Sequence, residues 1–198
     1  MAPKYPQILL QNRKPDRAAT LEEYRQSGGY QALATVMEKY SFKDLQATIL
    51  ESKLLGRGGA AFPAGVKLTS VDENAPFPRY IVCNADEMEP GTFKDRVLIH
   101  ADPHMIIEGM ILAGFGISAE KGIIFIRPEY ESCAKIFERE IQVAREAGYL
   151  GKNILGSNYS LDIIVHRSAG RYICGEVTAQ LNALMGKRSQ RGLFDAFE

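Results

Sequence analysis

The sequence is poor in cysteine and histidine, and it has no excess of charge of either sign. Its three cysteines, Cys83, Cys133 and Cys174, lie far apart and form no CxxC motif, which argues against a disulfide framework, a zinc site and an iron–sulfur signature. Such sparse thiols are typical of small buried side chains in a reducing, cytoplasmic compartment. Basic and acidic residues number 24 each, so there is no electrostatic reason to expect binding to nucleic acid or to an anionic membrane.

Long apolar runs are also missing. A membrane-spanning helix needs roughly 20 apolar residues, and the longest candidate, residues 105–119, is shorter and carries Glu108. The N-terminus has no apolar segment followed by a small-residue cleavage site, so neither a signal peptide nor direct membrane insertion is expected. With 45% hydrophobic and 24% charged residues, the 198-residue chain has the composition of a soluble globular domain with its own core.

The residue types that bind metals or perform covalent catalysis are scarce too. His100 and His104 are four residues apart, but Pro103 lies between them, and His166 stands alone. We expect structural or solvated roles for all three histidines. No serine or cysteine lies in a nucleophile-elbow motif. The sequence therefore predicts no metal site and no catalytic side chain.

What the sequence does contain is an alternation of short β-branched runs with helical segments. Residues 79–85, 121–128 and 161–168 have the composition of buried strands. Helical patterns separate them at residues 104–119 and 129–150, and a further helix is expected from about Glu176. This order predicts an α/β fold with a parallel sheet flanked by helices and joined by right-handed crossovers.

The first 55 residues are predicted to form an N-terminal arm and helices. Residues 1–20 are polar and contain proline, as in an extended arm. Two helical pieces follow that are broken at Gly28 and Gly29, the second starting near Tyr30. Ser41 is placed to cap a third helix that ends at Gly56.

The stretch GRGGAAFPAGVK, residues 56–67, is rich in glycine and carries two cations and a phenylalanine. It is not a Walker A loop, because Leu68 stands where serine or threonine would be needed. Its glycines would let backbone amides approach a ligand closely, while Arg57 and Lys67 could contact a phosphate and Phe62 could offer a stacking face. The alternative is a flexible connector between helices with solvated cations.

The second stretch, CNADEMEPGTFKDR, follows the first predicted strand and sets Asp86, Glu87 and Glu89 within four residues. Carboxylates in this position accept hydrogen bonds from ribose hydroxyls and repel an additional phosphate on the ribose. Asn84 has both donor and acceptor groups for the edge of a heterocycle. A magnesium site that also uses phosphate ligands, or a solvated acidic turn, are the alternatives.

The third stretch, GRYICGEVTAQL, places Gly170, Tyr172, Gly175 and Glu176 between the last strand and its helix, with Thr178 in the first helical turn. A helix N-terminus suits a phosphate or an electron-rich ring oxygen. A capped helix start is the alternative reading. Because ligands of parallel sheets bind at the carboxyl ends of the strands, we expect all three stretches to meet there.

Together these stretches resemble the FMN- and NADH-binding 51 kDa-type subunit of NADH:quinone oxidoreductase, the respiratory complex I, and the related flavoprotein subunits of NAD-reducing hydrogenases and formate dehydrogenases. GMILAGF and AGYLGKNILGS add to the match, which covers residues 21–188. The resemblance implies a Rossmann-like FMN-binding domain, predicted here as residues 56–188 and incomplete, after the arm and helices of residues 1–55. Residues 189–198 are predicted to be a divergent tail.

The resemblance also implies the ligand contacts. FMN would contact Gly56, Arg57, Gly58, Gly59, Lys67, Asn84, Asp86, Glu87, Tyr172, Gly175, Glu176 and Thr178. NADH would stack its adenine on Phe62, and Glu87 and Glu89 would line its nicotinamide and ribose. The implied partners are NADH and iron–sulfur subunits of the same complex, including a thioredoxin-like 24 kDa-type subunit.

This sequence departs from the family pattern at several positions. Val177 stands where the family has a second carboxylate, Ala61 where it has glycine, and Leu68 and Ser70 where it has aromatic residues. The family also continues into a region whose cysteines bind a [4Fe–4S] cluster, and those ligands are absent here, so we expect a truncated gene or a fragment rather than a compact variant.

Two functional readings follow. In the first, the chain is the N-terminal FMN-binding portion of an NADH dehydrogenase flavoprotein subunit and accepts hydride from NADH onto FMN. In the second, it is a non-catalytic binding or assembly module, or an inactive relic, of that subunit. In either case the incomplete sheet is expected to leave an apolar edge or face open.

Overall fold

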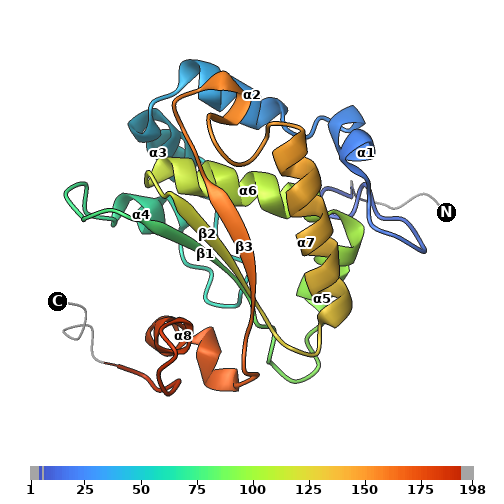
Figure 1. Cartoon of the computed structure of the whole chain (residues 1–198), viewed down its shortest axis with the longest axis vertical. Coiled ribbons are helices and arrows are strands. Elements are labelled where there is room, and N and C mark those ends of the chain that lie inside the picture. Colours follow the sequence, from blue (N-terminus) through green and yellow to red (C-terminus); the bar gives the residue numbers. More distant parts are fainter. Residues whose placement is uncertain (1–4, 6, 193–198) are drawn as a thin grey trace.

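The computed structural model describes Tyr5 and residues 7–192 and shows the α/β architecture that the sequence predicts (Figure 1). Its sheet has three parallel strands in the order β1-β2-β3, formed by Tyr80–Ala85, Lys121–Ile126 and Asp162–Arg167. Each strand lies within a segment predicted from its β-branched composition. The predicted tail, residues 189–198, lies outside the described residues from position 193 onward.

Two long helices cover one face of this sheet. Helix α6, Pro103–Gly116, contacts β1 and β2, whereas α7, Glu131–Glu146, contacts β3, and the two helices contact each other. Ile124, Ile126 and Ile163 point toward this layer and are fully buried. The pattern for α7 extended to residue 150, but the helix ends earlier, ahead of Gly148, whose φ of 77° is a left-handed conformation that glycine adopts readily.

The opposite face of the sheet is partly exposed. Tyr80 on β1 and Ile164 on β3 are each 53% exposed, and the register places Val82, Ile123 and Ile164 in one row across the three strands. At the carboxyl end of this face Phe125 is fully buried and stacks on His166. The expectation of an open apolar face therefore agrees with the geometry of the described strands.

The N-terminal helices pack around α6. Helices α1, Leu21–Gln26, α2, Gln31–Lys39, and α3, Phe42–Glu51, all contact it. Ser41 caps α3 as predicted, because its hydroxyl accepts a hydrogen bond from the Asp44 N–H. The break at Gly28 and Gly29 is also observed, with Tyr30 as the residue before α2.

Two helices are additional to the prediction, and the last helix begins close to the expected position. Helix α4, Ala64–Thr69, begins inside the glycine-rich stretch, and α5, Lys94–Ala101, follows the acidic stretch. Two short 3₁₀ turns, η1, Ile154–Gly156, and η2, Tyr172–Gly175, flank β3, and α8, Val177–Leu184, follows η2. Figure 1 shows α8 beside the carboxyl ends of the strands.

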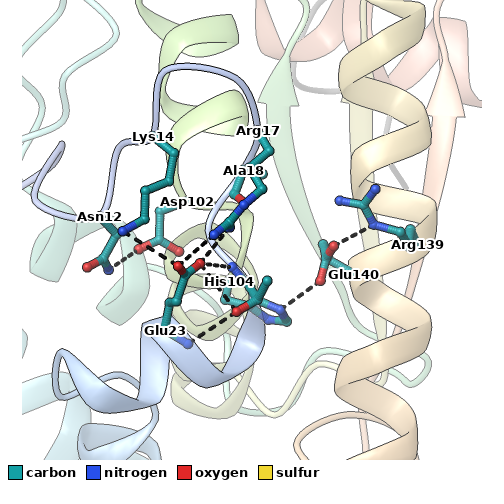
Figure 2. Close-up of polar contacts among 10 residues, drawn as sticks. Asn12, Lys14, Arg17, Ala18, Glu23, Asp102, His104, Arg139 and Glu140 are labelled. Atoms are coloured by element: carbon teal, nitrogen blue, oxygen red, sulfur yellow. Dashed lines mark hydrogen bonds and ion pairs between the residues drawn. The ribbon is translucent and has the colours of Figure 1, made fainter.

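Buried polar side chains join the N-terminal segment to α6 and α7. His104, which is fully buried, lies between the Tyr30 hydroxyl at 3.0 Å and the Glu140 carboxylate at 3.0 Å. Arg139 donates to the other oxygen of Glu140 at 2.6 Å (Figure 2). Burial acts to raise the pKa of Glu140, but the hydrogen bonds with His104 and Arg139 together outweigh it and hold that pKa below its ordinary value. These contacts give His104 the structural role expected from sequence.

No helix within the described residues is both long and apolar enough to cross a membrane.

Candidate functional site

A cleft of about 850 Å³ opens at the carboxyl ends of β1 and β3. Its walls come from the glycine-rich stretch, the loop after β1, the start of α5, and η2 with the residue that precedes α8. The lining residues are Arg57, Gly58, Gly59, Asn84, Asp86, Glu87, Met88, Glu89, Thr92, Lys94, Asp95, Tyr172, Ile173, Gly175 and Glu176. The three motif stretches therefore meet where the parallel topology predicts, in a volume suited to a small-molecule ligand.

The first wall is a loop whose two ends are joined by backbone contacts. Leu55 and Pro63 form an antiparallel bridge at its base, and the Gly56 N–H donates to the Phe62 carbonyl at 2.9 Å. Gly59 has a φ of 110°, a conformation that other residues rarely adopt. The loop thus has defined ends and presents its tip to the cleft.

The glycines of this stretch serve two different purposes. A side chain at Gly65 would meet the backbone of Leu50 at 2.4 Å, so this glycine lets α4 pack closely on α3. A side chain at Gly58, or at Gly175 on the other side of the cleft, would meet no protein atom within 4 Å. Packing does not require glycine at these two positions, which leave open space beside the cleft.

The second wall contains a buried carboxylate with one free oxygen. Asp86 is 5% exposed, and its Oδ1 accepts a hydrogen bond from the Ser168 hydroxyl at 2.6 Å. Its Oδ2 has no hydrogen-bond partner among the described residues. Burial raises the pKa of Asp86, and the bond from Ser168 opposes that shift only in part. Because buried polar atoms are rarely left without a partner, the unpaired Oδ2 is a notable acceptor at the cleft.

Glu87 and Asn84 instead shape the protein around the cleft. The Glu87 side chain is 2% exposed, and its carboxylate accepts bonds from the Asp95 N–H and the Tyr130 hydroxyl, both at 3.0 Å. It thereby caps the N-terminus of α5. The Asn84 amide oxygen accepts from the Asp86 N–H at 3.1 Å, which fixes the turn after β1.

The third wall closes on the second through one hydrogen bond. The Tyr172 hydroxyl in η2 donates to the Glu89 carboxylate at 2.5 Å, and this bond raises the pKa of Tyr172. Glu176 is the N-cap of α8, since its Oε2 accepts from the Ala179 N–H at 2.9 Å and from the Thr178 hydroxyl at 2.5 Å. The capped helix start that the sequence left open as an alternative is therefore observed. The capping residue, Glu176, also lines the cleft.

Four of the residues predicted to form the site lie outside the cleft lining: Gly56, Phe62, Lys67 and Thr178. Phe62 is 54% exposed and Lys67 lies on α4, whereas Thr178 is fully buried. The cleft also contains five residues that the prediction omitted: Met88, Thr92, Lys94, Asp95 and Ile173. All five lie within the three motif stretches, so their position in those stretches is the sequence feature that could have identified them as cleft residues.

The cleft lining is acidic. Five carboxylates, Asp86, Glu87, Glu89, Asp95 and Glu176, face two cations, Arg57 and Lys94. Lys94 pairs with Asp95 at 2.7 Å and with Glu87 at 3.7 Å. In spite of these acids, no group of three or more His, Cys, Asp or Glu side chains could hold a metal ion within the part of the chain that the structure describes.

Residues 49–195 match the protein family described as the Nuo51 FMN-binding domain, Complex1_51K. The chain belongs to this family. The F subunit of the NADH-quinone oxidoreductase of Aquifex aeolicus is 48% identical over 91% of this chain and 42% of its own length. The corresponding F 2 subunit of Rhizobium meliloti is 44% identical over 96% of this chain and 45% of its own length. The chain therefore spans less than half the length of these curated relatives.

A solved structure supports the fold of this Nuo51 FMN-binding domain. The NAD+-reducing [NiFe]-hydrogenase in its H2-reduced state matches 83% of this chain with a TM-score of 0.68 and 33% sequence identity. The match covers 30% of the hydrogenase chain. The family and the α/β fold expected from sequence are thus confirmed.

Replacing Ala61 with glycine is expected to stabilise this Nuo51 domain by about 0.5 to 1 kcal/mol, or roughly 1 to 4 °C in Tm. Ala61 has a φ of 51°, where its Cβ is strained and glycine is not. Thermal unfolding followed by circular dichroism measures the change. Ala60→Gly is the matched control, because Ala60 has no positive φ and glycine there only adds entropy to the unfolded chain. Equal Tm changes in the two variants would contradict the prediction.

Replacing Asp86 with asparagine is expected to raise Tm at pH 7. Because burial raises the pKa of Asp86 above its unfolded value, the ionised carboxylate lowers stability at pH values above its folded pKa. This loss disappears as the pH falls through that pKa. The Tm difference between variant and wild type should therefore shrink from pH 7 toward pH 4. A difference that grows on acidification would show that the charge stabilises the fold.

Proposed function

We propose that this chain is the FMN-binding portion of an NADH dehydrogenase flavoprotein subunit, accepting hydride from NADH onto FMN for transfer to iron–sulfur clusters. The observation that carries the proposal is the cleft itself. It combines a buried carboxylate with a free oxygen at Asp86 and open backbone at Gly58 and Gly175, in a member of an FMN-binding family.

The residues present fit a flavin nucleotide. The free Asp86 Oδ2 can accept a hydrogen bond from a ribityl hydroxyl, and the exposed amide side chain of Asn84 can address the edge of a heterocycle. The backbone at Gly58 and Gly59 can approach a phosphate, and Arg57 can add a charged donor. Gly56, Lys67, Tyr172, Glu176 and Thr178 belong to the proposed FMN set with them. Bound FMN would supply the hydride-accepting ring, which no side chain can replace.

The acidic lining supports NADH rather than NADPH as the proposed reductant. Glu89 is exposed at the cleft and can accept hydrogen bonds from ribose hydroxyls. Together with Glu87 it would repel an additional ribose phosphate. Phe62 is proposed to stack on the adenine, since its ring is 54% exposed beside the glycine-rich loop. These side chains bind and orient the nucleotide, and none of them takes part in a covalent step.

The larger assembly is also part of the proposal. The relatives are subunits named for NADH-quinone oxidoreductase, and the structural neighbour is a hydrogenase. We propose NADH and iron–sulfur subunits, including a thioredoxin-like 24 kDa-type subunit, as partners in a cytoplasmic setting. A [4Fe–4S] cluster is not part of the proposed site, since the three cysteines of the sequence, Cys83, Cys133 and Cys174, form no CxxC motif.

An FMN titration followed by anaerobic reduction tests the proposal. Binding should quench flavin fluorescence at a stoichiometry of one per chain, and NADH should then bleach the flavin absorbance faster than it bleaches free FMN. No quenching in excess FMN would reject the binding step for this chain. Tight binding without faster bleaching would favour the non-catalytic module. The Glu87 and Glu176 carboxylates also favour that alternative, because both accept hydrogen bonds from N–H groups at helix N-termini and are less available to a nucleotide.

A further inference from the structure

A second pocket lies between the N-terminal arm and α5. Its volume is about 300 Å³, and its charged lining consists of Arg13, Lys14, Asp16 and Arg17 from the arm with Arg96 and His100 from α5. We call it the arm pocket. Lys94 and Asp95, at the start of the same helix, line the cleft instead. The two cavities thus share no lining residue, and the arm pocket is separate from the proposed flavin site.

The arm pocket carries uncompensated positive charge. Lys14 and Arg17 both pair with a single carboxylate, that of Glu23 on α1, at 3.5 and 2.7 Å (Figure 2). Arg13 and Arg96 have no carboxylate oxygen within 4.0 Å among the described residues. Asp16 is the one acid of the described lining, so the four arginine and lysine side chains exceed the acids near them.

The two unpaired guanidinium groups also have free donors. Neither Arg13 nor Arg96 donates a side-chain hydrogen bond to another described residue. Arg96 lies 5.8 Å from the ring centroid of Phe93 and 6.0 Å from that of Tyr130, so aromatic faces orient its guanidinium without neutralising it. An arginine held in this way keeps its forked N–H donors available.

The arm that forms one wall is fixed to the domain. The Asn12 amide donates to the buried Asp102 carboxylate at 2.6 Å (Figure 2) and to the Ser27 hydroxyl at 2.9 Å. Further along, the Ala19 N–H donates to the Ala101 carbonyl at 3.0 Å. These bonds bracket residues 13–17, so the backbone that carries the arm's cations does not need to be ordered when a ligand binds, which lowers the entropic cost of binding.

We propose that the arm pocket binds a phosphate dianion, either inorganic phosphate or the phosphoryl group of a small monoester. A tetrahedral phosphate dianion carries two charges and three terminal oxygens or more for the Arg13 and Arg96 forks, whereas a carboxylate carries one charge on two oxygens. The volume admits a phosphoryl group with a few further atoms. The larger cleft, of about 850 Å³, is the one proposed above for the flavin nucleotide.

Calorimetric titration of the FMN-free chain at constant ionic strength tests this site. The probes are inorganic phosphate and glycerol phosphate, with chloride as the reference anion. We expect saturable binding of phosphate that Arg13→Gln and Arg96→Gln each weaken by about tenfold or more. Lys187→Gln is the matched control, because it removes one exposed charge outside both cavities and should leave the affinity unchanged.

The results of these titrations decide whether the arm pocket binds phosphate and which form of phosphate it prefers. Tighter binding of glycerol phosphate than of phosphate would support a monoester ligand, and equal binding would support recognition of the phosphoryl group alone. Equal weakening by Lys187→Gln would show a general effect of net charge and would overturn the site. Absence of saturation up to high millimolar phosphate would overturn it as well. Because Gly58 lines the cleft and not the arm pocket, loss of phosphate binding in a Gly58→Leu variant would also count against the arm pocket.

Discussion

Replacing Glu108 with glutamine is expected to lower the free energy of unfolding by about 3 kcal/mol, or roughly 6 to 12 °C in Tm. Glu108 lies on α6 and is 6% exposed. Its carboxylate accepts hydrogen bonds from the Tyr24 hydroxyl, from the Tyr30 N–H at 2.9 Å and from the Leu33 N–H at 3.1 Å. It is therefore the acceptor on which the N-terminal helices converge.

The loss of stability is large because α2 has no side-chain cap at its own N-terminus. Tyr30 is the N-cap of α2, with a φ of 62° and no side-chain cap of its own, so Glu108 from α6 supplies the missing acceptor. Tyr24 and Tyr30 donate to one oxygen of Glu108 and Leu33 to the other, so a glutamine that keeps the first two bonds turns its NH2 group toward the Leu33 N–H. Buried donors without acceptors cost about 1 to 3 kcal/mol each.

Chemical denaturation measures the change, and hydrogen exchange locates it. Exchange should accelerate first at the α2 amides. Glu120→Gln is the control, since Glu120 is exposed and its side chain makes no hydrogen bond or ion pair within the described residues. A Glu108→Gln variant as stable as Glu120→Gln would show that α2 is capped in another way.

The second large effect concerns the cleft. Gly58→Leu is expected to weaken FMN binding at least about 100-fold while leaving the fold intact. A Cβ added at Gly58 would meet no protein atom within 4 Å, and Gly58 lines the cleft, so we expect a leucine side chain there to occupy space in the cleft rather than in the core. Flavin fluorescence titration measures the affinity, and circular dichroism with Tm checks the fold.

Gly109→Leu is the matched control for this variant. Gly109 is an exposed glycine on α6, and a Cβ added there would likewise meet no atom within 4 Å beyond the backbone of its own helix, but Gly109 does not line the cleft. Leucine at that position should leave FMN affinity unchanged and raise helix stability slightly. Equal affinities for Gly58→Leu and the wild type would remove the glycine-rich loop from the flavin site.

The strands could be predicted from the sequence because their β-branched composition is a local pattern. The meeting of the three motif stretches could be predicted because ligands of parallel sheets bind at the carboxyl ends of the strands. Residues 121–128, for example, are a β-branched run that pairs on both sides as β2. Helix α5 was not predicted, because it begins after Pro90 and Gly91 and its cap comes from Glu87, whose carboxylate accepts from the Asp95 N–H. Such a contact depends on how the loop after β1 folds back.

The different roles of the neighbouring acids Asp86 and Glu87 could not be predicted from the sequence either, because these roles also depend on tertiary contacts. Asp86 and Glu87 are adjacent and both were expected to contact a ligand. The fold gives Glu87 three partners, Asp95, Tyr130 and Lys94, and leaves one oxygen of Asp86 without any among the described residues. Burial and partners are tertiary properties, so residue type and spacing cannot separate the two roles.

The row Val82, Ile123 and Ile164, of which Ile164 is the exposed member, offers a position from which binding of other polypeptides to this face of the sheet can be followed. Because Ile164 is 53% exposed, a cysteine introduced there by Ile164→Cys should react rapidly with a thiol reagent in this chain. The native thiols react more slowly, since burial raises the pKa of Cys83 to about 11 and Cys133 and Cys174 are buried. Slower labelling of that cysteine when other polypeptides are added would identify those that cover this face, without requiring any cofactor or enzymatic turnover.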